Sequence, residues 1–471
     1  MRPEGVRPRR AFGLGLVAGG IYFGGTLYWT PDVLRTFGGI SLPLAVVAGG
    51  LLVAYLALFP ALVAVVVARV CGRIGPHGVL VTPAVWVAAE LARRWILGGF
   101  PWVQLGSSQA GITPIVQTAS LAGVYGLSAL VAFAASALAL VVGGRGRARW
   151  MAPAAAACLV GGLAAWGAWR AQEGSLLRDG QPVRVAIVQG NVLQNEKWDR
   201  DRATDILNRY LAMTRESAAR GASLIIWPES STPFMFEHDP AGRFAITRLA
   251  RGLGVAMLFG SDQYEPGKPP RFYNSAFLVG PDGQTAAVYR KMHLVPFGEF
   301  VPLKRLLFFV TPLVESVSDF SPGETYVVMP LGANRLSTAI CYEVVYPDLV
   351  ASFVRRGSQL LTTITNDAWY GHSSAPPQHF WQATLRAVEQ GRYLVRSANT
   401  GISGIVDPYG RVVLQTPIFK QMVATGDVRY LDGQTLYSRT GDALAYACGL
   451  VTLLAWWMGR PSGTTGRRRP R

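Results

Sequence analysis

Three reactive side chains each stand at the end of a short apolar run. Glu229 closes LIIWPE, Lys291 follows AAVYR, and Cys341 follows LSTAI. A carboxylate can accept the proton of a thiol, an ammonium can lower the thiol pKa and hold an oxyanion, and a thiolate can attack a carbonyl carbon. The three residue types together therefore predict nucleophilic catalysis by a cysteine.

Apolar runs of this length are typical of buried strands, and strand ends that face one edge of a sheet are where α/β domains build sites. We therefore expect Glu229, Lys291 and Cys341 to meet. Taken singly, each has an ordinary interpretation as a small core residue, a turn residue or part of a solvated face. Only the set of three indicates catalysis.

His293 is a rival for the role of base. It lies two residues after Lys291, so along a strand both side chains would point to the same face. Cysteine–histidine pairs are common in acyl transfer. We favour Glu229, because the set of three already supplies a base and a single histidine is more often structural.

Residues 173–436 are the polar part of the chain, where β-rich runs alternate with helical stretches. Strands are expected at Val183–Val188, Leu224–Trp227, Val255–Gly260, Ala276–Val279, Ala286–Tyr289, Leu336–Ile340 and Leu360–Thr365. Helices are expected at Arg202–Ala219, Pro347–Arg355 and His379–Val395. This alternation, with hairpins, predicts a layered α/β domain.

The chain as a whole is too apolar for a soluble protein of 471 residues, since 50% of its residues are hydrophobic and only 15% are charged. Six apolar segments of about twenty residues could cross a bilayer, near 11–30, 44–68, 78–96, 115–142, 151–169 and 441–458. Five lie in residues 1–172, and the sixth, with a basic tail, lies in 437–471. The sequence predicts a polytopic α+β membrane protein.

The net charge of +17 is concentrated in arginine runs beside the apolar segments. They lie in both terminal tails, at Arg69 and Arg73, and at Arg145, Arg147 and Arg149. With six spans all four runs fall on one side, which the positive-inside rule places in the cytoplasm, so the polar part is expected outside it. The arginines form no stripe interleaved with aromatic residues, so nucleic-acid binding is not indicated.

Three features of the outer side could meet lipid. Arg93 and Arg94 end the third span and could hold a lipid phosphate or snorkel to the headgroup layer, and both interpretations stay open. The loops Val295–Pro322 and Ser231–Pro240 carry apolar residues without periodicity and are either buried lids or segments that dip into lipid. Because large exposed apolar patches mark interaction sites, we favour lipid contact.

The cysteines and histidines predict no metal and no cofactor. Cys71, Cys158, Cys341 and Cys448 have no paired spacing, which argues against a disulfide framework and a zinc site. The five histidines are scattered, with no HExxH motif and no Cys/His cluster.

Longer motifs surround the three reactive residues. They are VQGNVLQNEKW (188–198), IIWPES (225–230), YNSAFLV (273–279), YRKMHLVPFGEFVP (289–302), AICYEVVYP (339–347), TNDAWYG (365–371) and RSANTGISG (396–404). The membrane part adds YFGGTLYW (22–29), GGFPWVQLGSSQ (98–109) and LAGVYGLSALV (121–131). With these stretches the sequence resembles the nitrilase superfamily and, within it, the apolipoprotein N-acyltransferase family. The resemblance covers nearly the whole chain and implies an extracytoplasmic α-β-β-α sandwich domain.

The resemblance also implies roles for individual residues. Glu229 would be the general base, Lys291 would stabilise the tetrahedral intermediate, and Cys341 would be the acylated nucleophile. Further residues implied to support activity or site shape are Glu299, Trp198, Tyr342 and Glu343. Because aromatic residues also fill cores, Trp198 and Tyr342 could equally be packing residues.

The implied reaction is a two-step acyl transfer. Cys341 would take an acyl chain from a glycerophospholipid, with phosphatidylethanolamine as the expected donor, and pass it to the α-amino group of a diacylglyceryl-cysteine at a lipoprotein N-terminus. A thioester is a better acyl donor to an amine than an ester, so the split into two steps is chemically sensible. The resemblance further implies a monomer in the bacterial inner membrane, with the catalytic domain on the periplasmic side.

Two other functions remain to be distinguished. A membrane-tethered amidase or nitrilase would use the same triad on a small polar substrate, and a catalytically silent lipid-binding or scaffold protein would keep only the fold. The apolar loops and the membrane motifs argue against the first, and the intact Glu229, Lys291 and Cys341 against the second. The family usually has eight spans, and since the first match begins at residue 22, two leading helices are expected to be missing.

Overall fold

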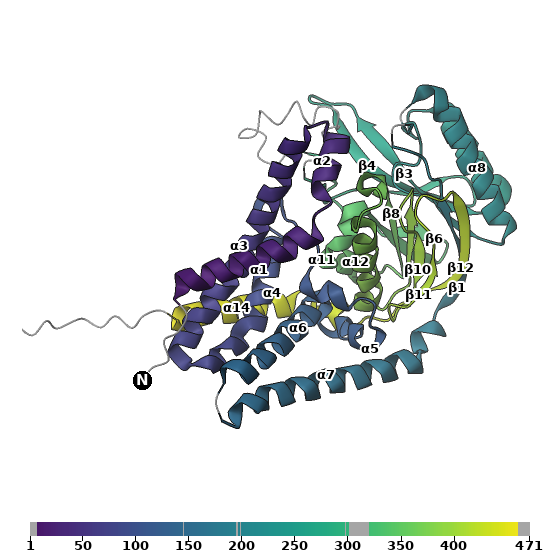
Figure 1. Ribbon diagram of the computed structural model, residues 1–471. Coiled ribbons are helices and arrows are strands. Elements are labelled where there is room, and N and C mark those ends of the chain that lie inside the picture. Colours follow the sequence, from purple (N-terminus) through teal and green to yellow (C-terminus); the bar gives the residue numbers. More distant parts are fainter. Residues whose placement is uncertain are drawn as a thin grey trace, which may run out of the picture.

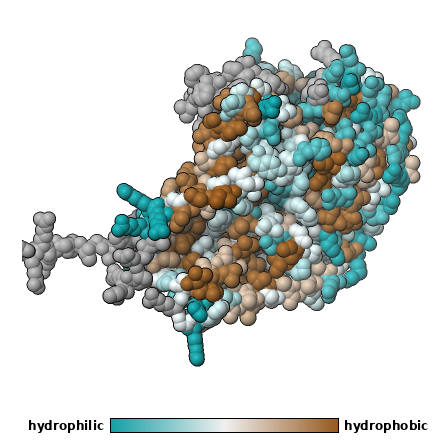
Figure 2. All heavy atoms as spheres, viewed as in Figure 1, coloured by the Kyte–Doolittle hydropathy of each residue, from teal (hydrophilic) through white to brown (hydrophobic). Residues whose placement is uncertain are grey.

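The computed structural model describes residues 7–144, 146–194, 196–197, 199–296, 298–300 and 320–459. Helices from both ends of the sequence gather on one side, and two β-sheets with their covering helices form the other (Figure 1). The space-filling view shows apolar surface over the helical side, while polar residues dominate the far end of the sheet domain (Figure 2). The helical side and the sheet domain thus correspond to the apolar and the polar parts of the sequence.

The helical side contains α1 (Pro8–Thr26), α2 (Thr30–Gly38), α3 (Leu42–Ile74), α4 (Thr82–Arg93), α5 (Thr113–Val116), α6 (Ala119–Gly143), α7 (Ala148–Glu173) and α14 (Ala443–Met458). By length and composition, three segments within the described residues could cross a membrane: α3, α6 and Arg149–Leu177, which holds most of α7. A fourth crossing follows if α1 and α2, bent by 53° at their junction, are one span.

The expected third and sixth spans are shorter in the structure than predicted. Within residues 78–96 the only α-helix is the 12-residue α4, which directly follows the 3₁₀ helix Pro76–Val81 and at about 1.5 Å per residue is much shorter than a hydrocarbon core of about 30 Å. Leu97, Gly98 and Gly99 follow with φ of 54°, 90° and 81°, a left-handed run that no α-helix accommodates. The last helix, α14, has 16 residues.

The other domain is built from two six-stranded sheets. The first has the order β12 (Met422–Tyr430), β1 (Gln181–Gln189), β2 (Leu224–Ile226), β3 (Ala256–Glu265), β4 (Arg271–Val279) and β5 (Thr285–Arg290). The second has the order β11 (Val412–Gln415), β10 (Gly404–Val406), β9 (Leu394–Ala398), β8 (Leu360–Thr365), β7 (Asn334–Ile340) and β6 (Met329–Leu331). Each sheet has a parallel centre, β1-β2-β3 and β7-β8-β9, flanked by antiparallel strands.

Alternation along the strands produces the layers. On β1, Val185 and Ile187 join the core shared with the second sheet, whereas Ala186 and Val188 face the opposite way, toward α8 (Ala203–Ala219) and α9 (Pro240–Leu253). On the second sheet, α11 (Pro347–Arg355) and α12 (Ala375–Gln390) form the other outer layer (Figure 1). Strands buried on both faces read as continuous apolar runs, and the result is the expected α-β-β-α sandwich.

One predicted helix ends earlier than its sequence pattern suggests. Residues 379–395 were expected to be helical, but α12 begins at Ala375 and stops at Gln390, and Leu394 already belongs to β9. Gly391, at φ 60°, caps the helix in the left-handed conformation. The next residues pair in parallel with β8, a long-range contact that local periodicity does not reveal.

Buried polar contacts hold the sandwich against the helices. Arg94, at the end of α4, donates from Nη1 to Asp442 Oδ2 (2.6 Å) and pairs with Asp348 on α11. Its side chain is 1% exposed, and the neighbouring Arg93 is also buried, over the ring of Phe23. Neither arginine snorkels, and Arg94 holds two carboxylates rather than a phosphate, so both interpretations of Arg94 from the sequence are wrong.

Further contacts of this kind lie along the same junction. Trp102 Nε1 donates to Gln378 Oε1 on α12 (2.8 Å), and the backbone N–H of Val124 on α6 donates to Glu389 Oε1 (2.8 Å). The side chain of Gln117 donates to the carbonyl of Tyr409 (2.8 Å). Because buried donors and acceptors need specific partners, these bonds fix the position of the catalytic domain on the helices.

We expect Arg94→Met to destabilise the protein by about 3 kcal/mol, because it leaves the carboxylates of Asp348 and Asp442 without their shared cation. Chemical unfolding in detergent, followed by tryptophan fluorescence, measures the effect. Arg184→Met is the matched control, since Arg184 pairs with Asp427 on the exposed surface and such pairs contribute less than about 1 kcal/mol. Equal losses in both variants would contradict the junction's role.

Candidate active site

The three predicted catalytic residues come together, but from two sheets rather than from one edge of a single sheet. Glu229 follows β2 and Lys291 follows β5 in the first sheet, whereas Cys341 follows β7 in the second. The site therefore lies where the two sheets face each other. Local sequence patterns find strand ends but not the sheet to which each strand belongs.

Lys291 lies between two carboxylates. Its Nζ donates to Glu299 Oε1 (2.8 Å) and to Glu229 Oε1 (3.3 Å), and its side chain is 1% exposed. Asn274 Nδ2 bonds to the same two oxygens, at 2.7 Å to Glu229 and 2.9 Å to Glu299. The ammonium and the amide thus each bond to both carboxylates, which orders the site before a substrate arrives.

The second oxygen and the backbone of Glu229 are also held. Glu229 Oε2 accepts the N–H of Asn366 (2.9 Å), and the Glu229 carbonyl accepts from Lys197 Nζ (3.2 Å). On β3, Gly260 passes so close that an added Cβ would lie 2.7 Å from Glu229 Cα, so only glycine fits there. Contacts to both carboxylate oxygens and to the backbone of Glu229 therefore fix its position.

Charges inside the site decide its resting protonation. Burial lowers the pKa of Lys291, but Glu299 and Glu229 outweigh it and raise that pKa above its ordinary value. Burial raises the pKa of Glu229, yet Lys291 and the Asn274 hydrogen bond outweigh it and lower that pKa. Burial and the charge of Glu229 raise the pKa of Cys341 despite Lys291. The site therefore rests with a thiol, a carboxylate and an ammonium, and the lysine does not produce a thiolate in advance.

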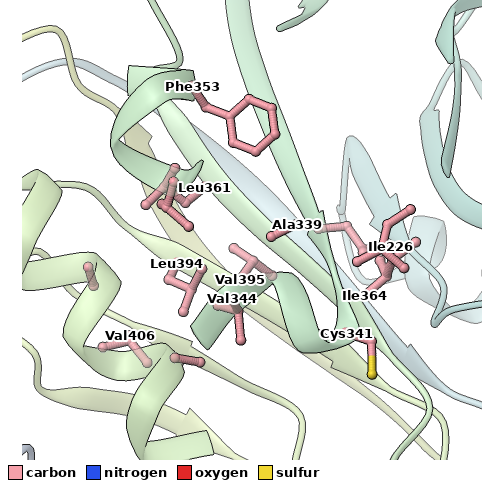
Figure 3. Packing of buried hydrophobic residues seen from close by; sticks show 14 of the residues in the cluster. Ile226, Ala339, Cys341, Val344, Phe353, Leu361, Ile364, Leu394, Val395 and Val406 are labelled. Carbon is pink, nitrogen blue, oxygen red and sulfur yellow. The ribbon is translucent and has the colours of Figure 1, made fainter. Parts of the chain in front are cut away.

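Cys341 occupies a sharp turn from β7 into the short helix η7 (Cys341–Val345) and belongs to the same buried cluster as Ile226 and Ile364 (Figure 3). Its φ is 52°, a left-handed conformation that costs a non-glycine residue roughly 1–2 kcal/mol. Such strain persists only where surrounding contacts hold it, and it is common at functional sites.

Glu343 supplies many of those contacts. Its Oε1 accepts from Tyr289 Oη (2.8 Å) and from the backbone N–H groups of Met292 (2.6 Å) and His293 (3.1 Å), while Oε2 accepts the N–H of Ile340 (2.8 Å). Burial raises the pKa of Glu343 to about 7, against these hydrogen bonds. The carboxylate joins the segment after Lys291 to the turn that carries the thiol.

Of the other residues predicted to support the site, two have described positions and one does not. Glu299 is part of the site, and its Oε2 also accepts the N–H of Val295 (2.8 Å). Tyr342 is buried and stacks on Trp102, with ring centroids 6.2 Å apart. Trp198 lies outside the described residues.

His293 does not lie on a strand, because β5 ends at Arg290, so the strand alternation expected from the sequence does not apply. Its ring stacks on Tyr346 at 4.3 Å between centroids. Burial lowers the pKa of His293. These contacts describe a packed residue beside the site.

The two apolar loops also have separate outcomes. In Ser231–Pro240, Phe236 is buried against Phe259 and Phe277, so the lid interpretation is right for this side chain and lipid contact is wrong. Most of the other loop, 301–319, lies outside the described residues.

Several site residues escaped the sequence analysis. Asn274, Asn366 and Lys197 all contact Glu229, yet each is only one polar residue within a longer motif. The only sign of a role for these three residues in the sequence was their position within the motifs YNSAFLV, TNDAWYG and QNEKW. Within the described part of the chain, no group of three or more His, Cys, Asp or Glu side chains is arranged to hold a metal.

Two family models match most of this chain, and solved structures resemble part of it. The carbon-nitrogen hydrolase family matches residues 184–434, and the apolipoprotein N-acyltransferase N-terminal domain matches residues 2–137. Among solved structures, a mutant amidase of the nitrilase superfamily from Nesterenkonia AN1 covers 57% of this chain and 97% of its own, at 21% identity and a TM-score of 0.44.

Curated relatives match almost the full length. An apolipoprotein N-acyltransferase from Geobacter metallireducens is 41% identical over 446 residues, covering 94% of this chain and 85% of the relative. One from Methylococcus capsulatus is 36% identical over 449 residues, covering 93% and 85%. The thiol, its two carboxylates and its lysine thus lie in a chain that belongs to the apolipoprotein N-acyltransferase family.

Proposed function

We propose that this chain transfers a fatty acyl group from a glycerophospholipid, through a thioester on Cys341, to the α-amino group of the diacylglyceryl-cysteine at a lipoprotein N-terminus. The observation that carries the proposal is the buried Lys291 between Glu229 and Glu299, beside a buried thiol, in a chain with membrane-spanning helices. The names of the curated relatives support a lipoprotein acceptor.

In the first half-reaction Glu229 is the general base. It takes the proton of the Cys341 thiol, whose raised pKa requires a base at the moment of attack. The sulfur attacks the ester carbonyl, Lys291 holds the oxyanion, and the carbon–oxygen bond breaks. Glu229 returns its proton to the departing alkoxide, which leaves as a lysophospholipid.

In the second half-reaction an amine replaces the alcohol. The acceptor's α-ammonium has a pKa near about 8, so it must lose a proton before its nitrogen can attack. Glu229 can take this proton, whereas Lys291 cannot, because its neighbouring carboxylates keep it charged. The carbon–sulfur bond breaks, the nitrogen loses its second proton to the leaving sulfur, and Glu229 releases its proton to solvent.

Aromatic side chains around the thiol favour the amine over water. Trp102 stacks on Tyr342, the residue after the nucleophile, and also contacts Tyr370 at 6.0 Å between ring centroids. Tyr342 directly follows Cys341 in the chain, and the side chain of Trp102 is only 1% exposed. Exclusion of water protects a reactive intermediate from hydrolysis.

Donor, location and assembly state complete the proposal. Phosphatidylethanolamine is the proposed donor, and the chain is proposed to act as a monomer in the bacterial inner membrane. With α4 and α14 counted as crossings despite their short length, all the arginine runs fall on one side of the helices, which supports a catalytic domain on the periplasmic side.

Glu343 is proposed to support the nucleophile without touching the substrate. Its oxygens accept four hydrogen bonds, three of them from backbone N–H groups that can only donate. A carboxylate suits this cage, and an amide does not.

A fatty acyl adduct on Cys341 tests the function. We expect purified protein incubated with phosphatidylethanolamine vesicles to carry an acyl group on the Cys341 peptide, detected by mass spectrometry and removed by hydroxylamine. Cys341→Ala should show none, and phosphatidylglycerol vesicles test the donor preference. Absence of the adduct with every phospholipid, together with hydrolysis of small amides, would instead support the amidase function.

Glu229→Gln should slow acyl-enzyme formation roughly 10²–10⁴-fold, since general-base catalysis contributes about that much. Single-turnover acylation of the purified variant measures the rate. Asp427→Asn, an exposed carboxylate variant on β12, is the control and should behave as wild type. A normal rate of adduct formation in Glu229→Gln would exclude Glu229 from the first half-reaction.

Glu343→Gln should lower stability by about 2 kcal/mol, because the new NH₂ group faces a backbone N–H that then lacks an acceptor. Acylation should slow as well, since the turn that holds Cys341 loses support. Unfolding and single-turnover acylation measure the two effects. Glu216→Gln, on the exposed surface of α8, serves as control; a Glu343→Gln variant as stable and active as this control would refute the supporting role.

A further inference from the structure

A buried polar cluster lies behind the nucleophile and has no role in the acyl transfer described above. It consists of Asp367 from the helix η8 (Asp367–Tyr370), His379 on α12 and Arg396 on β9. All three side chains are at most 1% exposed. His379 Nε2 lies 3.1 Å from the backbone carbonyl oxygen of Cys341, so the cluster reaches the nucleophile through its main chain.

The partners of the ring determine its tautomer. A carbonyl oxygen can only accept, so Nε2 must carry a proton and donate it to Cys341. Nδ1 lies 3.0 Å from both Arg396 Nη2, a donor, and Asp367 Oδ1, an acceptor, so both side chains orient the ring. Burial and the charge of Arg396 lower the pKa of His379, which keeps the ring neutral. The Nε2 contact and the lowered pKa together describe a neutral ring with its proton on Nε2.

Besides its contact with His379 Nδ1, Asp367 has two other hydrogen-bond partners. Asp367 Oδ2 accepts from Arg396 Nη2 (2.8 Å), and Asp367 Oδ1 accepts from Thr365 Oγ1 (2.9 Å). The two opposite charges already neutralise each other. What His379 adds is the link from this rigid pair to the carbonyl of Cys341.

The hydrogen bond from His379 ends at Cys341, the residue of the site with a strained backbone. Cys341 has φ 52°, and its carbonyl direction sets the peptide plane between the nucleophile and Tyr342. On the other side of the same peptide, Trp102 stacks on Tyr342 and also touches the His379 ring, with centroids 5.3 Å apart. The turn is thus held from α12 and from the helical side at once.

We propose that His379, oriented by Arg396 and Asp367, is a positioning residue that holds the Cys341 main chain in its reactive conformation; for acylation, this inference rests on the proposed function. His379 is not a second base. Its Nε2 proton is donated to the carbonyl, and its Nδ1 lies against Arg396 and Asp367. Its contribution is to keep the sulfur aimed between Glu229 and Lys291, since small displacements of a reacting group cost large factors in rate.

Three variants in the full-length protein test the proposal. His379→Gln can place an amide N–H where Nε2–H stands, His379→Asn cannot reach that point, and His379→Leu has no donor. Ser337→Ala on β7 is the matched control, because it removes a buried hydrogen bond to Ser358 four residues before the nucleophile. Single-turnover acylation by phosphatidylethanolamine vesicles and alkylation of Cys341 by iodoacetamide are measured, with thermal unfolding alongside.

We expect His379→Leu and His379→Asn to lower the maximal acylation rate roughly 10- to 100-fold with little change in the half-saturating phospholipid concentration, as expected for lost orientation. His379→Gln should recover most of the rate, and Ser337→Ala should retain it. If His379→Leu does not fold, the comparison of Gln with Asn decides.

Equal rates in His379→Gln and His379→Asn, whether both normal or both low, would overturn the proposal. Iodoacetamide separates this outcome from failure of the proposed function. If wild-type protein forms no acyl adduct, but the rate of Cys341 alkylation still differs between Gln and Asn at equal stability, the positioning role stands while the acyl-transfer function fails.

Discussion

The buried ammonium of Lys291 between the carboxylates of Glu229 and Glu299 is the interaction on which the site depends. A buried charge is costly unless it is paired and hydrogen-bonded, and here each charge compensates another. Burial and the nearby charge of Glu229 disfavour a further anion on the Cys341 sulfur. The thiol therefore stays protonated until Glu229 accepts its proton, and the site stores no free thiolate that oxidants could attack.

This electrostatic arrangement requires precise supports from distant parts of the chain. Asn274 on β4 and the backbone of Asn366 hold the carboxylate of Glu229, and Glu343 joins the segment after Lys291 to the turn of Cys341. These elements come from both sheets. Packing of one sheet on the other is thus a catalytic requirement as well as a source of stability.

The helices contribute to the same centre. Trp102 reaches from the helical side to Tyr342 and His379, and Arg94 ties α4 to Asp348 and Asp442. Trp102, Tyr342 and Tyr370 thus connect the helical side with the turn that holds the thiol. The catalytic sandwich and the apolar helices are thus joined into one structure. This fits the proposed reaction between two lipid-borne substrates.

The sequence alone determined the residue types, the strands and the broad class. Strand ends before Glu229, Lys291 and Cys341 are readable because buried strands are continuous apolar runs, and the motifs around them indicate the family. Only the tertiary structure decided that the three residues come from two sheets, that Arg94 binds carboxylates, and that α12 ends at Gln390. It also showed that His379 reaches the Cys341 carbonyl across 38 positions of sequence. Each of these depends on contacts between residues far apart in the chain, and local periodicity carries no information about such contacts.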